Sequence, residues 1–194
     1  MPEPAIEVEV LIEDPKWRAV PRIKNIAVRA ATAAFAAGIP AGLRVSACVA
    51  LIDDRAIARL NHDFRGLPKP TDVLAFPQLP GNLRAIAARL KASRGKRARI
   101  ALGDVVVAFA TSAKGAREAK LKLADHTAHL VAHGALHLLG HDHAALTETK
   151  RMHGLECEAL AELDIADPYR APSVAVRPKP ESKSKVKKVK RARR

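Results

Sequence analysis

Four short apolar runs, separated by segments with a helical pattern, constrain the fold of this chain more than any other feature. The runs occupy residues 6–12, 43–51, 73–76 and 102–109. In the first run apolar and acidic residues alternate, which is the two-residue period of a half-buried strand. The third run is bounded by Pro70 and Pro77, as short strands commonly are. The sequence therefore predicts four strands.

Helical patterns occupy the segments between the first three runs. An Ala-rich pattern at residues 20–37 stops at Gly38 and Pro40, and glycine followed by proline commonly ends a helix. After the second run, Asp53 is followed by a short pattern that extends through Asn61. An aspartate side chain can accept hydrogen bonds from the first amides of a helix, so we expect a short helix here with an aspartate N-cap.

Two further helical patterns follow the fourth run. Residues 116–139 contain no proline and have recurring apolar positions, which predicts one long central helix. Residues 146–163 predict a last amphipathic helix that ends before Pro168. Residues 84–91 fit either a long connection or a small helix. The order of these elements favours a single-domain α/β or α+β fold, in which a small mixed four-stranded sheet packs against helices.

Composition and charge divide the chain into a folded part and a tail. The 194 residues are 48% hydrophobic but only 3% aromatic, which predicts one domain with a largely aliphatic core. Residues 171–194 contain ten Lys or Arg residues against one acidic residue, Glu181. We therefore expect a folded domain at residues 1–169 and a basic, disordered tail at residues 170–194.

Positive charge also indicates a class of partner. The formal net charge is +14, and residues 84–99 form a second basic run. Both basic regions are candidate contacts for a polyanion such as RNA, because neutralising phosphates releases counterions. The alternatives are a solvated extension for the tail and an ordinary surface loop for residues 84–99.

The chain has the features of a cytosolic protein. It contains no run of about 18 uncharged apolar residues and no signal-peptide pattern at its start, so we expect neither a membrane nor secretion. Cys48 and Cys157 are its two cysteines, too few for a disulfide framework, and we expect reduced thiols. The sequence gives no indication of the oligomeric state.

The segment HGALHLLGHDH, which begins at His133, has the spacing of a metal site. His133 and His137 are four residues apart, so on a helix they share one face, with about 6 Å of axial rise between them. Gly140 can end the helix in a left-handed conformation and return the chain, so that His143 reaches the same ion. Three imidazoles with a fourth position left to water are typical of a catalytic zinc site. We therefore expect one Zn²⁺ per chain at the end of the central helix.

Other histidines compete for the same roles. His129 and His133 are also four apart, although no nearby turn would bring them a third ligand. His141 competes with His143 for the third position, and the spacing does not decide between them. A non-metal interpretation, with buried or surface histidines, is less favoured because five histidines fall within fifteen residues.

The spacing His-x3-His-x5-His also matches the metzincin zinc proteases. Those proteases require a glutamate directly after the first histidine as the general base, and here that residue is Gly134. A metalloprotease-like hydrolase is therefore an alternative function, but one that would lack its base. A third hypothesis is a non-catalytic RNA- or ribosome-binding protein in which zinc only stabilises the fold.

Several segments together resemble the YbeY family of bacterial rRNA maturation endoribonucleases. The family motif is close to H-G-x-L-H-L-x-G-Y-D-H, and this chain has His141 where tyrosine is commoner. The resemblance extends in order over residues 6–163. It includes NHDFR at 61–65, PTDVLAFP at 70–77, LGDVVV at 102–107, and Met152 with Glu156. The basic residues 84–99 and the tail lie outside this pattern.

The resemblance implies both a function and a set of site residues. It implies zinc ligands at His133, His137 and His143, and a functionally important arginine at Arg65. It further implies a single-strand-specific endoribonuclease of the cytoplasm that acts in rRNA 3′-end maturation and ribosome quality control. The expected partners are rRNA, the small ribosomal subunit and ribosome-associated proteins.

The chemistry expected at this site is phosphodiester cleavage. A zinc ion with an open position can activate water and polarise a phosphoryl oxygen. Arg65 can present a planar fork to the phosphate, although from the sequence alone an ordinary surface ion pair is the simpler interpretation. Spacing assigns no general base, because Asp72, Asp104 and Asp142 all fit structural roles equally well.

Overall fold

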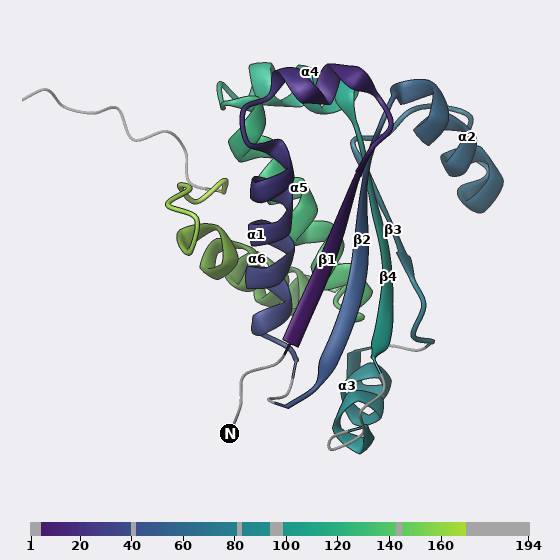
Figure 1. Ribbon diagram of the computed structural model, residues 1–194, viewed down its shortest axis with the longest axis vertical. Coiled ribbons are helices and arrows are strands. Elements are labelled where there is room, and N and C mark those ends of the chain that lie inside the picture. The colour runs from purple at the N-terminus through teal and green to yellow at the C-terminus, as the bar shows by residue number, and fades with distance from the viewer. Residues whose placement is uncertain (1–4, 40–41, 81–82, 94–98, 143–144, 170–194) are drawn as a thin grey trace, which may run out of the picture.

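A mixed four-stranded sheet with helices on both faces forms the framework of the protein (Figure 1). The computed structural model describes residues 5–39, 42–80, 83–93, 99–142 and 145–169. The strands are β1 (Ala5–Ile12), β2 (Arg44–Ile52), β3 (Val73–Pro77) and β4 (Ile100–Ala108). The helices are the 3-10 helix η1 (Pro15–Ala19), α1 (Ile23–Ala36), α2 (Asp54–Arg65), α3 (Leu83–Ala92), α4 (Phe109–Glu118), α5 (Leu123–Leu138) and α6 (Leu146–Ala161).

The sheet order is β1-β2-β4-β3, and this order places β3 at an edge. The first three strands of that order are parallel, and β3 pairs antiparallel with β4 from Val73 opposite Val107 to Pro77 opposite Gly103. The predicted mixed sheet of four strands is therefore confirmed. The short edge strand ends in a proline, which cannot donate to a further strand.

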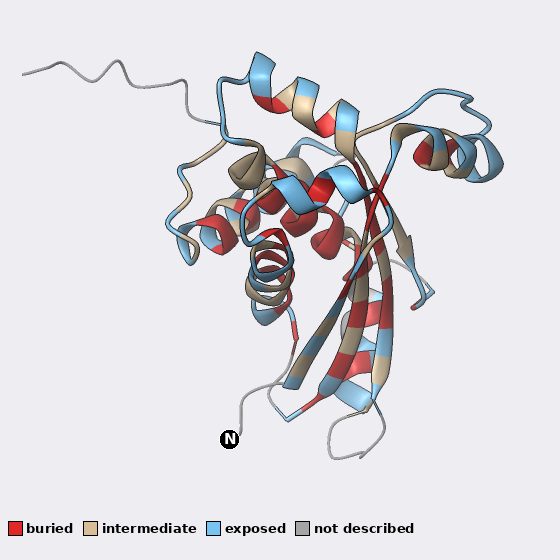
Figure 2. Ribbon diagram, turned by 45° about the horizontal axis from the view of Figure 1, so that its top comes forward, coloured by how far each residue is buried: buried red, intermediate tan, exposed pale blue. Residues whose placement is uncertain are grey.

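The main core lies between one face of the sheet and helices α1, α5 and α6 (Figures 1 and 2). Because strand side chains alternate between faces, Val105 and Val107 belong to this core, whereas Val106 belongs to a smaller cluster on the other face. Ile57 of α2 covers that second cluster. Trp17 and Phe35 are the aromatic members of the main core, which is otherwise aliphatic, as the composition predicts.

The predicted single helix over residues 116–139 is wrong. Two helices occupy this part of the chain, α4 and α5, and α4 already begins at Phe109. The break is at Lys120, whose φ of 56° lies in the left-handed region and interrupts the run of helical hydrogen bonds. The Leu121 N–H closes the turn by donating to the Ala116 carbonyl at 2.8 Å. Neither glycine nor proline marks this position, so the sequence gives no break signal.

Other elements follow the sequence patterns closely. The Asp53 side chain accepts from the Ala56 N–H at 2.7 Å and caps α2, as predicted. Of the two alternatives for residues 84–91, the small helix is correct, because α3 spans them. The tail at residues 170–194 lies outside the described residues. Within the described part of the chain, no helix is both long and apolar enough to cross a membrane.

Candidate metal centre

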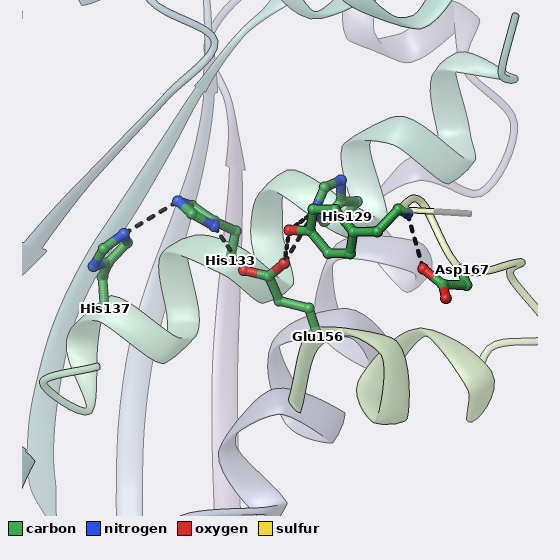
Figure 3. A network of polar contacts seen from close by, with 6 residues as sticks. His129, His133, His137, Glu156 and Asp167 are labelled. Atoms are coloured by element: carbon green, nitrogen blue, oxygen red, sulfur yellow. Dashed lines mark hydrogen bonds and ion pairs between the residues drawn. The ribbon is translucent and has the colours of Figure 1, made fainter. Parts of the chain in front are cut away.

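Helix α5 brings His133 and His137 together near its C-terminal end. Their Nε2 atoms lie 3.1 Å apart and their rings meet edge to face, with centroids separated by 4.7 Å. Figure 3 shows the two rings pointing toward each other from successive turns of the helix. Two imidazole nitrogens on a tetrahedral zinc ion would be about 3.3–3.4 Å apart, given Zn–N distances of roughly 2.0–2.1 Å. The observed separation fits this geometry to within a few tenths of an ångström.

The other nitrogen of each ring has an acceptor. His133 Nδ1 donates to Glu156 Oε1 at 2.7 Å, and His137 Nδ1 donates to the backbone carbonyl of His141 at 2.9 Å. A carboxylate and a carbonyl can only accept, so in the neutral rings both Nδ1 atoms carry the proton and both Nε2 atoms present lone pairs. Two lone pairs directed at each other repel unless they share a cation. The donor set therefore fits a metal ion held between the two Nε2 atoms.

The expected turn after α5 is also present. Gly140 has a φ of 84°, and its N–H donates to the His137 carbonyl at 2.9 Å. The next N–H, that of His141, donates to the Leu136 carbonyl at 3.1 Å, so the chain reverses directly after the second histidine. This return is the path that the sequence analysis required for a third ligand.

The third ligand is not determined by the described residues. His143 lies outside them, and residues 5–39, 42–80, 83–93, 99–142 and 145–169 contain no complete group of three metal-binding side chains. His141 is buried at 7% exposure, and burial, with a smaller contribution from Arg151, lowers its pKa. Its backbone carbonyl already orients His137, and its side chain lines the same cavity.

The competing pair of His129 and His133 is not the pair that converges. Their ring centroids are 6.4 Å apart, against 4.7 Å for His133 and His137. His129 Nε2 lies instead 3.2 Å from Glu156 Oε2 and 3.2 Å from the Tyr169 hydroxyl. The described geometry therefore favours the register chosen from the sequence.

Glu156 is a site residue to which the sequence analysis assigned no role. It comes from α6, has no exposed surface, and contacts His129, His133 and Tyr169. Burial raises the pKa of this carboxyl, but hydrogen bonds from the two histidines and the tyrosine outweigh burial and hold the pKa well below its ordinary value. The available signal was its place in the family resemblance, four residues after Met152.

The converging histidines line a cavity of about 640 Å³ between α5 and the edge strand β3. Arg65, the last residue of α2, lines the same cavity although it is distant in the sequence. Among the described residues, the lining consists of Arg65, Thr71, Asp72, Val73, Ala75, Pro77, His133, Gly134, His137, Gly140, His141 and Asp142. The structure thus brings together every described residue that the sequence analysis placed in the site.

The three carboxylates considered from the sequence are in different positions. Asp72 and Asp142 line the cavity, whereas Asp104 lines hollows elsewhere, beside Cys48 on β2. Asp72 is engaged in the turn before β3, because its Oδ1 accepts from the Val73 N–H at 2.9 Å and from the Thr71 hydroxyl at 3.1 Å. Its backbone carbonyl accepts from the Ala108 N–H at 2.9 Å. Asp72 therefore has a structural role in holding this wall of the cavity.

Gly134 has a packing reason to be glycine. A Cβ at this position would lie 2.6 Å from Val105 Cγ1 and 3.1 Å from Val105 Cγ2, so α5 approaches the sheet closely here. Val105 is 1% exposed. The protease-type glutamate would have to occupy this contact, and the helix–sheet packing leaves no room for it.

Comparison with known proteins identifies the family. A family model described as endoribonuclease YbeY matches residues 13–164. The chain belongs to the endoribonuclease YbeY family. The resemblance stated from the sequence motifs is thereby confirmed.

Individual YbeY relatives match over most of their length. A protein named endoribonuclease YbeY from Sphingopyxis alaskensis is 43% identical over 144 residues, which are 74% of this chain and 83% of that protein. The one from Dinoroseobacter shibae is 39% identical over 86% of this chain and 92% of its own length. The one from Azorhizobium caulinodans is 40% identical over 87% and 99%.

Among solved structures, a Thermotoga maritima protein determined in solution is 20% identical to this chain. It aligns with a TM-score of 0.47 and covers 86% of this chain and 98% of its own. The assignment to the YbeY family does not depend on this likeness.

Proposed function

We propose that this chain is a zinc-dependent endoribonuclease that cleaves single-stranded RNA in rRNA 3′-end maturation and ribosome quality control. Membership of the YbeY family supports cleavage of RNA. The observation that supports the metal is the pair of Nε2 atoms of His133 and His137, 3.1 Å apart, in a cavity that Arg65 also lines. This role places the protein in the cytoplasm, with rRNA of the small ribosomal subunit as its substrate.

In this proposal His133, His137 and His143 hold one Zn²⁺ per chain. The first two are supported by their convergence and by their oriented Nδ1 atoms. The third rests on the family resemblance. Three imidazole ligands would leave zinc a position for substrate or water, and a zinc ion held there would supply Lewis-acid chemistry to the phosphodiester.

The remaining chemistry comes from the walls of the cavity. Arg65 is an exposed arginine at the end of α2, and Gly66 ends the helix directly after it with a φ of 69°. Its guanidinium binds the scissile phosphate through two parallel hydrogen bonds and stabilises the charge that develops there. Strand β3 forms another wall, from which Val73, Ala75 and Pro77 line the cavity.

The experiment that tests this function is cleavage of single-stranded rRNA fragments by the purified full chain. The protein is assayed as purified, after removal of metal with a chelator, and after zinc is restored. His137→Ala removes one proposed ligand, and His62→Ala is the matched control because His62 is an exposed histidine of α2 outside the cavity. Zinc content is measured for each variant.

We expect cleavage by the wild type and by His62→Ala, loss of cleavage after chelation, and recovery with zinc. We expect His137→Ala to lose both cleavage and zinc. Cleavage that persists in His137→Ala or without metal would refute the zinc-nuclease assignment. Binding of RNA without cleavage would favour the non-catalytic RNA-binding alternative. The protease alternative is disfavoured by the structure, because the packing at Gly134 leaves no room for a glutamate as the general base.

A second part of the proposal concerns the division of the chain. We propose that residues 1–169 form the catalytic domain and that residues 170–194, which lie outside the described residues, are a separate basic tail. The supporting observation is that the family match ends at residue 164. The tail would add sequence-independent affinity for RNA through contacts to phosphates.

A further inference from the structure

A buried carboxylate contacts one of the two converging histidines at the ring nitrogen that faces away from the other histidine. Glu156 of α6 has no exposed surface, and among the described residues it is the one acidic side chain buried to this degree. A carboxylate loses its hydration when it is buried, so it persists in a core only where several donors replace the water. The donors around Glu156 therefore indicate what this residue is for.

The two carboxylate oxygens of Glu156 serve different partners. Oε1 accepts from His133 Nδ1 at 2.7 Å, and this is the shorter of the two contacts that Glu156 makes with histidines. Oε2 accepts from His129 Nε2 at 3.2 Å and from the Tyr169 hydroxyl. One oxygen is thus directed at a proposed metal ligand, and the other is held by residues that are not ligands. Figure 3 shows this chain of contacts from His137 through His133 and Glu156 to His129.

Tyr169 is fixed on this carboxylate by its ring as well as by its hydroxyl. The ring stacks on His153 with centroids 3.8 Å apart and an interplanar angle of 18°. It also meets His129 edge to face at 5.5 Å. Two aromatic contacts therefore hold the phenol in the orientation that directs its O–H at Glu156.

The two proposed ligands are oriented in different ways. His137 Nδ1 donates to a backbone carbonyl, whereas His133 Nδ1 donates to a side chain. A substitution can therefore remove the acceptor of His133 and leave that of His137 in place. This asymmetry allows the orienting role of the acceptor to be measured on one ligand alone.

We propose that Glu156 is a positioning residue, which sets the tautomer and ring orientation of His133 for metal binding, and that Tyr169 holds Glu156 in place. Because Glu156 accepts a hydrogen bond from His133 Nδ1, the proton stays on Nδ1, and Nε2 is left as the ligand atom. The inference rests on the proposed metal site. It goes beyond that site because it assigns a role in metal affinity to two residues that do not touch the metal.

The first measurement is zinc affinity, determined by competition with a chromogenic chelator, in the full chain. Loss of such an acceptor typically weakens metal binding about 10–100-fold, and we expect Glu156→Gln to raise the Kd for zinc by this factor. Tyr169→Phe keeps the stacked ring and removes the hydroxyl, so we expect a smaller rise. The matched control is Glu158→Gln, the same substitution at an exposed position of the same helix, for which we expect no change.

The second measurement separates positioning from a merely structural role. Long-range proton–nitrogen NMR of the metal-free protein reports which ring nitrogen of His133 is protonated. We expect the Nδ1-protonated form in the wild type and in Glu158→Gln, and a mixture of tautomers in Glu156→Gln. Thermal melting checks that each variant is folded, and Tyr169→Phe carries the test if Glu156→Gln does not fold.

The outcomes distinguish this inference from the proposed function. If the wild type binds zinc and Glu156→Gln binds it equally well with an unchanged tautomer, the positioning role is refuted while the metal site stands. If the wild type binds no zinc, the proposed function fails. In that case, comparison of the His133 tautomer between the wild type and Glu156→Gln still shows whether Glu156 determines which ring nitrogen is protonated.

Discussion

Replacement of Gly134 by alanine tests whether close packing of α5 on the sheet sets the position of the candidate site. The added Cβ would lie 2.6 Å from Val105 Cγ1, whereas carbon atoms pack best at about 3.5–4.0 Å, so a shift of roughly 1 Å is required. Val105 is 1% exposed and belongs to the main core, so its packed neighbours oppose its displacement. The strain therefore falls on α5, which carries His133 and His137.

The magnitude follows from two opposing effects. Inserting a methyl group into a packed core costs about 1–3 kcal/mol. Replacing glycine by alanine inside a helix gains about 1 kcal/mol from intrinsic propensity. We expect Gly134→Ala to lower the free energy of unfolding by about 1 kcal/mol and to weaken zinc binding, because both proposed ligands follow the helix. Denaturant unfolding and zinc titration measure the two effects.

Gly154 provides the matched control for this substitution. It lies in α6, and a Cβ there would have no neighbour within 4 Å, so Gly154→Ala should stabilise the protein by about 0.5–1 kcal/mol. Combining Gly134→Ala with Val105→Ala removes the clashing methyl groups, and we expect the double variant to be more stable than the sum of the single changes predicts. Equal stabilisation by Gly134→Ala and Gly154→Ala would refute the packing argument.

Three further predictions concern the substrate, the tail and a buried thiol. Arg65→Lys should retain RNA binding but lose most cleavage, since an ammonium cannot replace a planar two-point contact to phosphate, and equal cleavage rates for arginine and lysine would contradict this role. Deletion of residues 170–194 should flatten the dependence of log affinity on log salt by at most about 7 units for its ten basic residues, as measured by RNA binding at several salt concentrations. Burial, together with the nearby Asp104 and Glu9, raises the pKa of the Cys48 thiol above its ordinary value, so less thiolate is present at a given pH. Alkylation of Cys48 should therefore be slower in the folded chain than in urea at pH 8, and the rate in the folded chain should rise as the pH is increased.

The parts of the fold that could be predicted from the sequence are those determined by local patterns. Alternation identified β1, and the aspartate cap identified the start of α2. The break at Lys120 could not be predicted, because a left-handed lysine leaves no composition signal and depends on the packing of the helices on either side. The edge position of β3 depends on pairing between distant segments, which no local period determines.

The same distinction applies to the candidate site. His133 and His137 follow from helix geometry alone, because residues four apart share a face. Arg65 joins them only when folding brings the end of α2 to the cavity between α5 and β3, and the family resemblance, not the spacing, pointed to it. Glu156 reaches His133 across the contact between α6 and α5, so its role became visible only in three dimensions.

Two independent contacts determine how His133 is presented, and they constrain different movements. The contact between Gly134 and Val105 sets the distance of α5 from the sheet, and therefore the position of both histidines. The hydrogen bond from Glu156 sets the rotation and tautomer of one ring without moving the helix. Variants that alter these two contacts should therefore differ in their effects on stability and on zinc affinity. Gly134→Ala should change stability and zinc affinity together, whereas Tyr169→Phe should change zinc affinity with a much smaller change in stability, because Tyr169 is 43% exposed and retains its stacked ring.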